Sequence, residues 1–320
     1  MAHDFYRDKR VLVTGGAGFI GSHLVEALLD AHAMVTVVTH KETNLWRLVG
    51  AQNRIDILET DLHDARETQE TFQQAKPEIV FNLASLVRTE QSLDIVDDLL
   101  RGNVLIAKHV FGAARAVGVK KCVHVGSIEE YGHGTVPFVE EAREEPISPY
   151  SLAKVMTTHL AMLFHRLGGL RMCVVRPAAT YGPRQGFGML TPNFIKSCLE
   201  KKDFSMNPGE QVRDLIFVRD VAAGMLSAGA AEESDGEVIN LGSGSTYQIR
   251  EVTLLINQLL GAPITIHFGA YPYRPLDTMR FYMDSHKAHR LLGWYARTDL
   301  ISGMTETVEW YQQHYQEMPR

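Results

Sequence analysis

Several features that mark whole classes of protein are missing from these 320 residues. The three cysteines, Cys122, Cys173 and Cys198, form no CxxC pair, so we expect buried, inert thiols rather than a disulfide framework. No apolar run approaches the ~20 residues that span a bilayer, and the charged start MAHDFYRDKR has no apolar signal core. The histidines show no HExxH or similar metal-ligand spacing. We therefore expect a cytoplasmic, metal-free protein.

An excess of positive charge is also missing. The formal net charge of −6 argues against a general nucleic-acid-binding protein, which normally presents a basic surface. Hydrophobic residues make up 45% and charged residues 22% of the chain, as in ordinary globular proteins. The length allows one large domain or two modest ones, each with its own core.

Short apolar segments alternate with helical ones through the first half of the chain. The predicted strands lie at 10–16, 34–39, 54–61, 78–85, 120–127 and 171–178. Helical patterns, such as 21–31 and 97–118, separate them. Apolar strands separated by helices predict an α/β fold with a doubly wound (Rossmann) parallel sheet, covered on both faces.

The alternation ends near residue 180, where YGPRQGFGMLTPN is rich in glycine and proline. One later run, 236–244, has the composition of another buried strand. We predict a nucleotide-binding domain over 1–180, to which strand 236–244 returns. Residues 181–320 are predicted to form mainly a smaller α/β substrate domain.

A glycine-rich loop, TGGAGFIGSHL, follows the first predicted strand and opens the first helix. Gly15, Gly18 and Gly21 let the backbone turn tightly and approach a pyrophosphate at the helix N-terminus. Glycines also mark ordinary turns, but this position in a βα pattern favours dinucleotide binding.

The second predicted strand ends in VVTHKETNLWRL, where an NAD site normally carries a carboxylate. Here Thr39, His40 and Lys41 follow, with Arg47 a turn later, and these groups suit a 2′-phosphate. We therefore favour NADP(H) over NAD(H), although His40 and Lys41 also fit an ordinary polar loop. Asp61, at the end of the third strand, is a candidate acceptor for the adenine amino group.

The segment SPYSLAK places Tyr150 and Lys154 four residues apart, on one face of a helix. A nearby ammonium stabilises phenolate and can lower the pKa of a tyrosine by ~1–3 units. The pair can then exchange a proton with a sugar hydroxyl or ketone.

These motifs resemble the extended short-chain dehydrogenase/reductase family, which contains the NDP-sugar epimerases, dehydratases and ketoreductases. The resemblance rests on TGGAGFIG, the strand-end Ser127 and SPYSLAK, and it continues through RPAATYGP, VRDLIFVRD, NLGSG and YRPLDTMRFYMD. It implies that Tyr150 is the acid/base, that Lys154 holds the nicotinamide ribose and that Ser127 bonds the reacting oxygen. We expect further cofactor contacts from Phe19, Ile20, Leu62, Leu83 and Ala84.

The resemblance also implies an NDP-sugar substrate whose diphosphate is held by Arg213 and Arg274. The simpler alternative for each arginine is an ion pair with Asp214 or Asp277. Ala179 stands where many members have an asparagine, so the nucleotide base is not specified there. Further pocket residues are expected to be Val87, Arg88, Leu190, Thr191 and Asn193.

The loop GSIEEYG, residues 126–132, bears on the reaction. The family's 4,6-dehydratases carry an acid and a glutamate after the serine or threonine; here Glu129 matches the glutamate, but Ile128 replaces the acid. The loop is similar to that of reductases acting on 4-keto-6-deoxy sugars, so we expect NADPH-dependent reduction at C4, with Glu129 at the site and Glu130 solvated. The alternatives are a C4-epimerase or 4,6-dehydratase, and after them a decarboxylase or a non-catalytic NADP sensor.

The helices near 97–118 and 150–166 carry apolar residues on more than one face. In the family such helices pair with a second subunit as a four-helix bundle, so we expect a homodimer. Alternatively, both helices simply cover the sheet.

Overall fold

A computed structural model describes residues 2–88 and 90–319 of the chain. Its main sheet has seven parallel strands in the order β10-β6-β5-β4-β1-β2-β3. These strands are β1 (Arg10–Thr14), β2 (Met34–Thr39), β3 (Ile55–Glu59), β4 (Ile79–Asn82), β5 (Lys121–Val125), β6 (Met172–Pro177) and β10 (Glu237–Leu241). The predicted α/β class and Rossmann sheet are confirmed.

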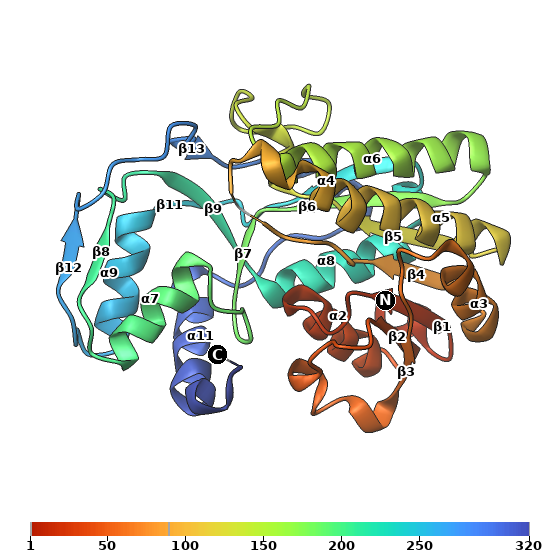
Figure 1. Cartoon of the computed structure of the whole chain (residues 1–320), viewed down its shortest axis with the longest axis horizontal. Helices are drawn as coiled ribbons and strands as arrows, with labels where there is room; N and C mark the ends of the chain where they lie inside the picture. Colours follow the sequence, from red (N-terminus) through yellow and green to blue (C-terminus); the bar gives the residue numbers. More distant parts are fainter. Residues whose placement is uncertain (1, 89, 320) are drawn as a thin grey trace.

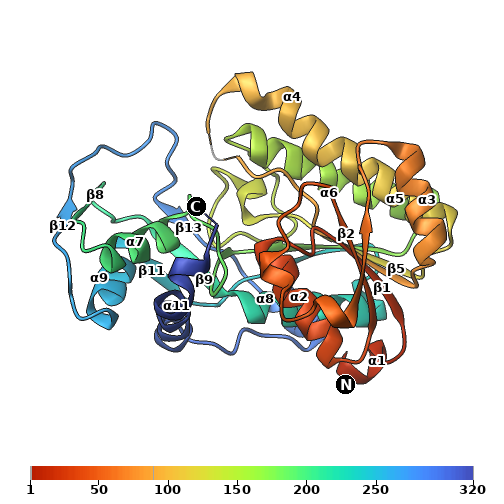
Figure 2. The same cartoon turned by 60° about the horizontal axis from the view of Figure 1, so that its bottom comes forward.

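Helices cover both faces of this sheet (Figures 1 and 2). One face carries α1 (Ala2–Tyr6), α2 (Phe19–Asp30), α8 (Val218–Ala230) and α10 (His286–Leu292). The other carries α3 (Ala65–Ala75), α4 (Val96–Leu99), α5 (Ile106–Ala116) and α6 (Pro149–Gly168). The inner strands are largely apolar because the side chains on each face of the sheet are buried in a separate core.

The long helix predicted over 97–118 is interrupted. A π-helical turn, η4 (Leu100–Leu105), lies between α4 and α5. Buried Asn103 donates from Nδ2 to the carbonyls of Leu99 and Leu86, at 3.0 and 3.1 Å. Gly102 lies against Leu86, and an added Cβ would be 2.7 Å from the Leu86 Cβ. The irregular turn therefore brings the segment after β4 close to the helix.

A smaller mixed sheet forms beside the main one (Figure 1). Its strands are β7 (Ala179–Tyr181), β9 (Val212–Phe217), β11 (Thr246–Gln248) and β13 (Arg280–Phe281). A separate parallel pair contains β8 (Phe204–Met206) and β12 (Ile266–Phe268). The neighbouring helices are α7 (Leu190–Leu199), α9 (Ile249–Leu259) and α11 (Leu300–His314). The short 3-10 helices are η1 (Trp46–Leu48), η2 (Gln52–Arg54), η3 (Leu93–Ile95), η5 (Ile128–Tyr131), η6 (Glu232–Ser234) and η7 (Tyr315–Glu317).

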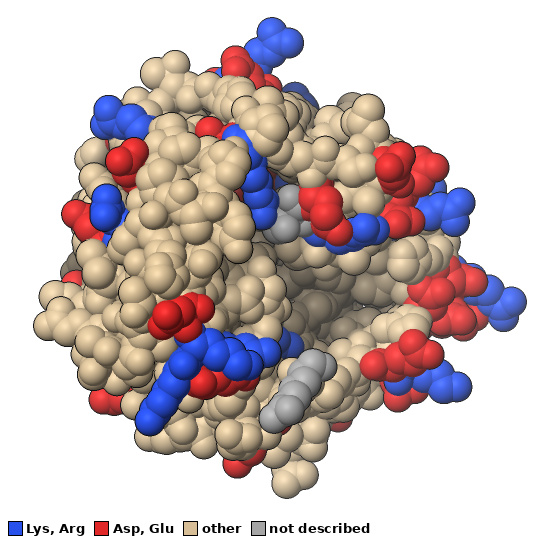
Figure 3. All heavy atoms as spheres, turned by 60° about the vertical axis from the view of Figure 1, so that its left-hand side comes forward, with Lys and Arg blue, Asp and Glu red and all other residues tan. Residues whose placement is uncertain are grey.

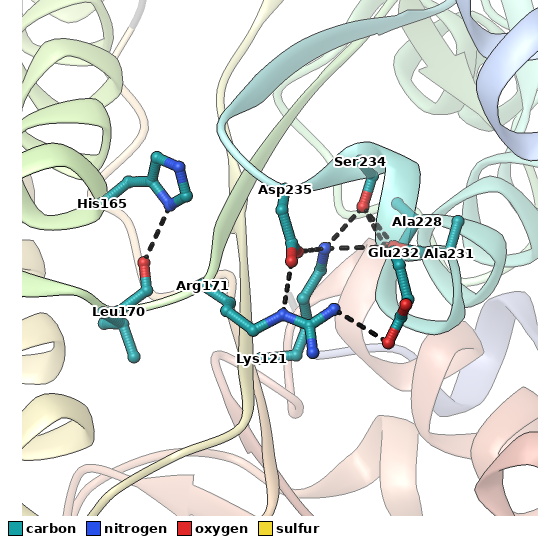
Figure 4. Close-up of polar contacts among 9 residues, drawn as sticks. All are labelled: Lys121, His165, Leu170, Arg171, Ala228, Ala231, Glu232, Ser234 and Asp235. Atoms are coloured by element: carbon teal, nitrogen blue, oxygen red, sulfur yellow. Dashed lines mark hydrogen bonds and ion pairs between the residues drawn. The ribbon is translucent and has the colours of Figure 1, made fainter.

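Buried polar contacts hold the returning strand β10 beside β6 (Figure 4). Lys121, at the start of β5, donates to Ser234 Oγ at 2.6 Å and to the Ala231 carbonyl at 3.2 Å. Its ammonium also pairs with Asp235, which in turn binds Arg171. These contacts fix the turn that precedes β10. The proposed domain boundary near residue 180 remains a prediction.

All three cysteines are free and buried, and burial raises the pKa of Cys173 and Cys198 to about 11. Within residues 2–88 and 90–319, no helix is long and apolar enough to cross a bilayer. The same residues contain no cluster of three or more His, Cys, Asp or Glu side chains able to hold a metal ion.

Candidate active site

The glycine loop joins β1 to α2 and packs against the end of β4. Gly15 has φ +68, and a Cβ there would lie 2.8 Å from Leu83 C and Ala84 N. The Ala84 N–H donates to Thr14 Oγ1 at 3.2 Å. The loop therefore lies close to Leu83 and Ala84, whose contacts with a cofactor remain a prediction, and position 15 requires glycine.

The first turn of α2 fits a dinucleotide diphosphate. Gly18 caps the helix without a side-chain hydrogen bond, and the first turn carries no acidic residue. The first N–H groups of a helix lack intrahelical partners and carry partial positive charge. This turn therefore presents backbone N–H groups, those of Phe19, Ile20 and Gly21, that can donate hydrogen bonds to a phosphate.

The residues expected around the adenosine lie at the ends of β2 and β3. Thr39 is buried, whereas His40 and Lys41 are exposed. Asp61 accepts from the backbone N–H of His63, which lowers the pKa of the carboxyl and keeps it ionised. Leu62 is buried. Whether His40 and Lys41 bind a phosphate remains a prediction.

Arg47 reaches the glycine loop from η1. Its Nε donates to the Arg184 carbonyl at 2.9 Å, and its Nη1 donates weakly to the Ala17 carbonyl at 3.5 Å. It also lines a cavity of about 590 Å³ with Trp46 and Trp310. The guanidinium is thus held largely by backbone carbonyls.

The residues expected to transfer protons meet where β5 and α6 adjoin. Ser148 caps α6, which places Tyr150 in the first turn and Lys154 one turn later. Lys154 Nζ lies 5.8 Å from the centre of the Tyr150 ring and donates to the Val125 carbonyl at 2.9 Å. The predicted shared face of Tyr150 and Lys154 is therefore present.

Two serines hydrogen-bond the Tyr150 phenol: Ser127, which follows β5, and Ser85, which follows β4. Ser85 in turn bonds Asn103 in the π-helical turn. The sequence analysis missed Ser85. Adjacent parallel strands end at the same edge of a sheet, so its place after β4, the neighbour of β5, was a usable signal.

The electrostatics of the pair differ from the sequence expectation. Burial, and then the charges of Glu129 and Glu130, raise the pKa of Tyr150, although its bonds to Ser127 and Ser85 oppose this. Burial lowers the pKa of Lys154 to about 8, against the effect of Glu130. The expectation of a lowered tyrosine pKa is therefore wrong for the protein alone, because desolvation and the two carboxylates raise it.

Glu129 is near enough to interact electrostatically with both Tyr150 and Arg213, the arginine expected to hold a diphosphate. Burial raises the pKa of Glu129, with Arg213 lowering it and Asp277 raising it. Arg213 Nη2 is 3.2 Å from Asp277 Oδ1, so the simpler ion-pair interpretation describes one of its contacts. Asp214 instead accepts from Ser243.

Glu130 is not solvated, contrary to the sequence expectation. Its side chain is 0% exposed and pairs with the equally buried Arg176, 2.7 Å away. A partner 46 residues later in the chain thus decides its environment.

The other residues expected to contact the substrate lie on loops and at the start of α7. Arg274 is exposed, and Val87 is half-exposed. Arg88 pairs with Asp98 at 3.0 Å and with Glu90 at 3.1 Å. Leu190, Thr191 and Asn193 form the first turns of α7. Figure 3 shows a deep hollow with charged side chains of both signs around its rim. The substrate roles of these residues remain predictions.

Comparisons with known proteins identify similar chains. Residues 11–242 match the model of the NAD dependent epimerase/dehydratase family. A UDP-glucose 4-epimerase of Mycolicibacterium smegmatis is 32% identical over 95% of this chain and 98% of its own.

Two solved structures share the fold. The UDP-glucose 4-epimerase of Thermotoga maritima, solved with UDP-glucose, has a TM-score of 0.89 and 29% identity over 95% of this chain and 99% of its own. The dTDP-glucose 4,6-dehydratase DesIV of Streptomyces venezuelae, solved with NAD, has a TM-score of 0.87 and 26% identity over 96% and 98% of the two chains.

Proposed function

Because the chain belongs to the NAD-dependent epimerase/dehydratase family, whose enzymes act on NDP-sugars, we propose that it is an NDP-sugar C4-epimerase. The observation that carries this proposal is the Ser127–Tyr150–Lys154 arrangement beside an apolar Ile128. That isoleucine is 3% exposed and belongs to the hydrophobic core with Tyr131 and Phe138. It has no proton to donate, so the acid that a dehydratase needs is missing. Similarity to the M. smegmatis epimerase also favours epimerisation over the reduction expected from the sequence.

In this function Tyr150 takes the proton from the C4 hydroxyl while Ser127 hydrogen-bonds the same oxygen. A bound NAD(P) would supply the hydride acceptor and a positive charge that favours the phenolate. Lys154 would hold the cofactor ribose. After the 4-keto sugar has turned its other face, the hydride would return from the reduced cofactor to C4 while Tyr150 returns the proton to the C4 oxygen. Arg213 and Arg274 would anchor the diphosphate throughout.

A reductase that consumes NADPH is the second candidate. The observation favouring it is the end of β2, where Thr39 with exposed His40 and Lys41 replaces a carboxylate. A carboxylate would repel a 2′-phosphate, whereas these groups would not. The presence of Glu129 beside the site is also compatible with this reaction.

The test begins with the purified protein as isolated. Mass spectrometry identifies any nucleotide that it retains. The protein is then incubated with UDP-glucose or dTDP-glucose without added reductant, and with NDP-4-keto-6-deoxy sugars plus NADPH or NADH. Tyr150→Phe is the control for each reaction.

Retained NAD and interconversion of the C4 epimers would support the epimerase. Loss of one water from the product mass would identify a dehydratase, and oxidation of NADPH with a keto sugar would identify the reductase. Either result would overturn the C4-epimerase proposal, as would the absence of epimerisation of any NDP-hexose.

We also propose that the chain forms a homodimer through α6. Leu152, Met156, Leu163 and Leu167 of this helix are 39–79% exposed, an apolar surface that a partner helix would cover. Analytical ultracentrifugation should show a dimer for the wild type and a monomer for Leu163→Asp/Leu167→Asp. A monomeric wild type would contradict the proposal.

A further inference from the structure

Glu130 and Arg176 form an ion pair that is withdrawn completely from solvent. Both side chains are 0% exposed. Glu130 Oε2 accepts from Arg176 Nε at 2.9 Å, and the guanidinium also lies over the Tyr131 ring, 4.6 Å from its centre. Apolar side chains of similar volume are often as stable as a buried ion pair. Stability alone therefore does not explain why charged groups occupy this position.

The second oxygen of the Glu130 carboxylate holds the loop that carries Ser127. Oε1 accepts from the Ser127 backbone N–H at 2.8 Å. Ser127 Oγ in turn accepts from the Glu129 N–H at 3.1 Å, which completes a capping box around η5. A Cβ on Gly126 would lie 2.4 Å from Glu130 Oε1, so the glycine leaves room for the carboxylate.

The same arginine connects this loop to the helix of the tyrosine. Arg176 Nη2 lies 2.7 Å from Glu144 Oε1. Glu144 Oε2 lies 3.5 Å from His159 Nε2, and His159 belongs to α6, which carries Tyr150. The two elements that present the serine and tyrosine hydroxyls therefore share one polar network, which is buried at Glu130 and Arg176 and reaches solvent at His159.

We propose that Glu130 is a positioning residue: anchored by Arg176, its carboxylate fixes the backbone of Ser127 so that the serine hydroxyl and Tyr150 meet one substrate oxygen. This inference rests on, and deepens, the proposed function. Small displacements of reacting groups can cost ~100-fold in rate. Glu130 itself touches neither substrate nor cofactor in this scheme.

The charge of Glu130 provides a second, independent measurement. The hydroxyls of Ser127 and Ser85 bond the Tyr150 phenol, and the charged groups near it are Glu129 and Glu130 from η5 and Lys154 from α6. Both carboxylates raise the pKa of Tyr150. Glu130→Gln keeps an oxygen for the Ser127 N–H but loses the charge, so the tyrosine should ionise at lower pH.

The experiment compares Glu130→Ala, Glu130→Gln and the apolar pair Glu130→Leu/Arg176→Met with the wild type. Steady-state kinetics use the NDP-sugar that the wild type converts. Ionisation of Tyr150 is followed by ultraviolet absorbance as the difference from a matched Tyr150→Phe background. The control is Lys121→Met, which breaks another buried ion pair, at the opposite end of β5.

Glu130→Ala should lower kcat by roughly 10- to 100-fold with little change in KM, because alignment is lost while binding groups remain. Glu130→Gln should retain most of kcat but shift the rising limb of its pH profile, and the Tyr150 titration, to lower pH. Lys121→Met should lower the stability of the protein but change neither kcat nor the Tyr150 titration. If Glu130→Ala does not fold, the apolar pair variant should fold and show the same loss of kcat.

Wild-type activity together with unchanged kcat in a folded Glu130→Ala or pair variant would overturn the positioning role. Turnover of no sugar by the wild type would instead reject the proposed function. In that case the Tyr150 titration and a crystal structure of the pair variant still decide the inference. An unshifted titration in Glu130→Gln, or Ser127 unmoved in the crystal, would contradict it.

Discussion

Removing the Lys154 ammonium should stabilise the cofactor-free protein, although it removes a group required by the proposed reaction. The side chain is 4% exposed, and burial lowers its pKa from 10.5 to about 8. The folded state therefore binds this proton less readily than the unfolded state. Burying the ammonium therefore lowers the free energy of unfolding. This destabilisation is fully present below pH 8 and disappears as the pH rises from about 8 to 10.5.

The shift of about 2.5 pKa units corresponds to about 3 kcal/mol at neutral pH. Loss of the hydrogen bond from Lys154 to Val125 offsets about 1 kcal/mol of this. Lys154→Met should thus raise the free energy of unfolding by about 2 kcal/mol at pH 7. This advantage should shrink by about 2 kcal/mol between pH 7 and pH 9.5, as the wild-type lysine loses its proton.

Urea denaturation of nucleotide-free protein at several pH values measures this difference. Subtracting the wild-type curve from that of Lys154→Met cancels the buried tyrosines and cysteines, which also titrate at alkaline pH. Lys121→Met is the matched control, because its lysine is equally buried but paired with Asp235, and its removal should destabilise the protein at every pH. A Lys154→Met protein that is less stable than wild type at pH 7, or a difference independent of pH, would refute the reasoning.

Three other substitutions test the site. Tyr150→Phe should lower kcat by ~100-fold or more, with cofactor affinity unchanged in calorimetry, and retained turnover would exclude the acid/base role. Gly15→Ala should abolish dinucleotide binding, since its Cβ would meet Leu83 and Ala84 at φ +68, whereas Gly112→Ala, with nothing within 4 Å, should bind normally. Arg213→Met should raise KM by roughly 10- to 100-fold, because it removes a charge-assisted hydrogen bond to the substrate. An unchanged KM would show that Arg213 does not bind the diphosphate.

Local rules accounted for much of the fold and part of the site. Apolar strands between helices predicted the parallel sheet, and the separate run 236–244 predicted a strand that does return, as β10. The four-residue spacing of Tyr150 and Lys154 placed both side chains on one face of α6, because helix geometry is set by neighbouring residues. The break in the helix over 97–118 was not predicted, since it depends on contacts of Asn103 with Leu86 across the fold.

Hydrophobic period and backbone geometry act over short distances, so neighbouring residues were enough to predict the sheet, the glycine loop and the tyrosine–lysine spacing. The burial of Glu130 with Arg176, the bond of Ser85 to Tyr150 and the raised pKa of Tyr150 follow instead from tertiary packing. Burial and long-range charge depend on which distant segments pack together. No pattern of neighbouring residues contains that information.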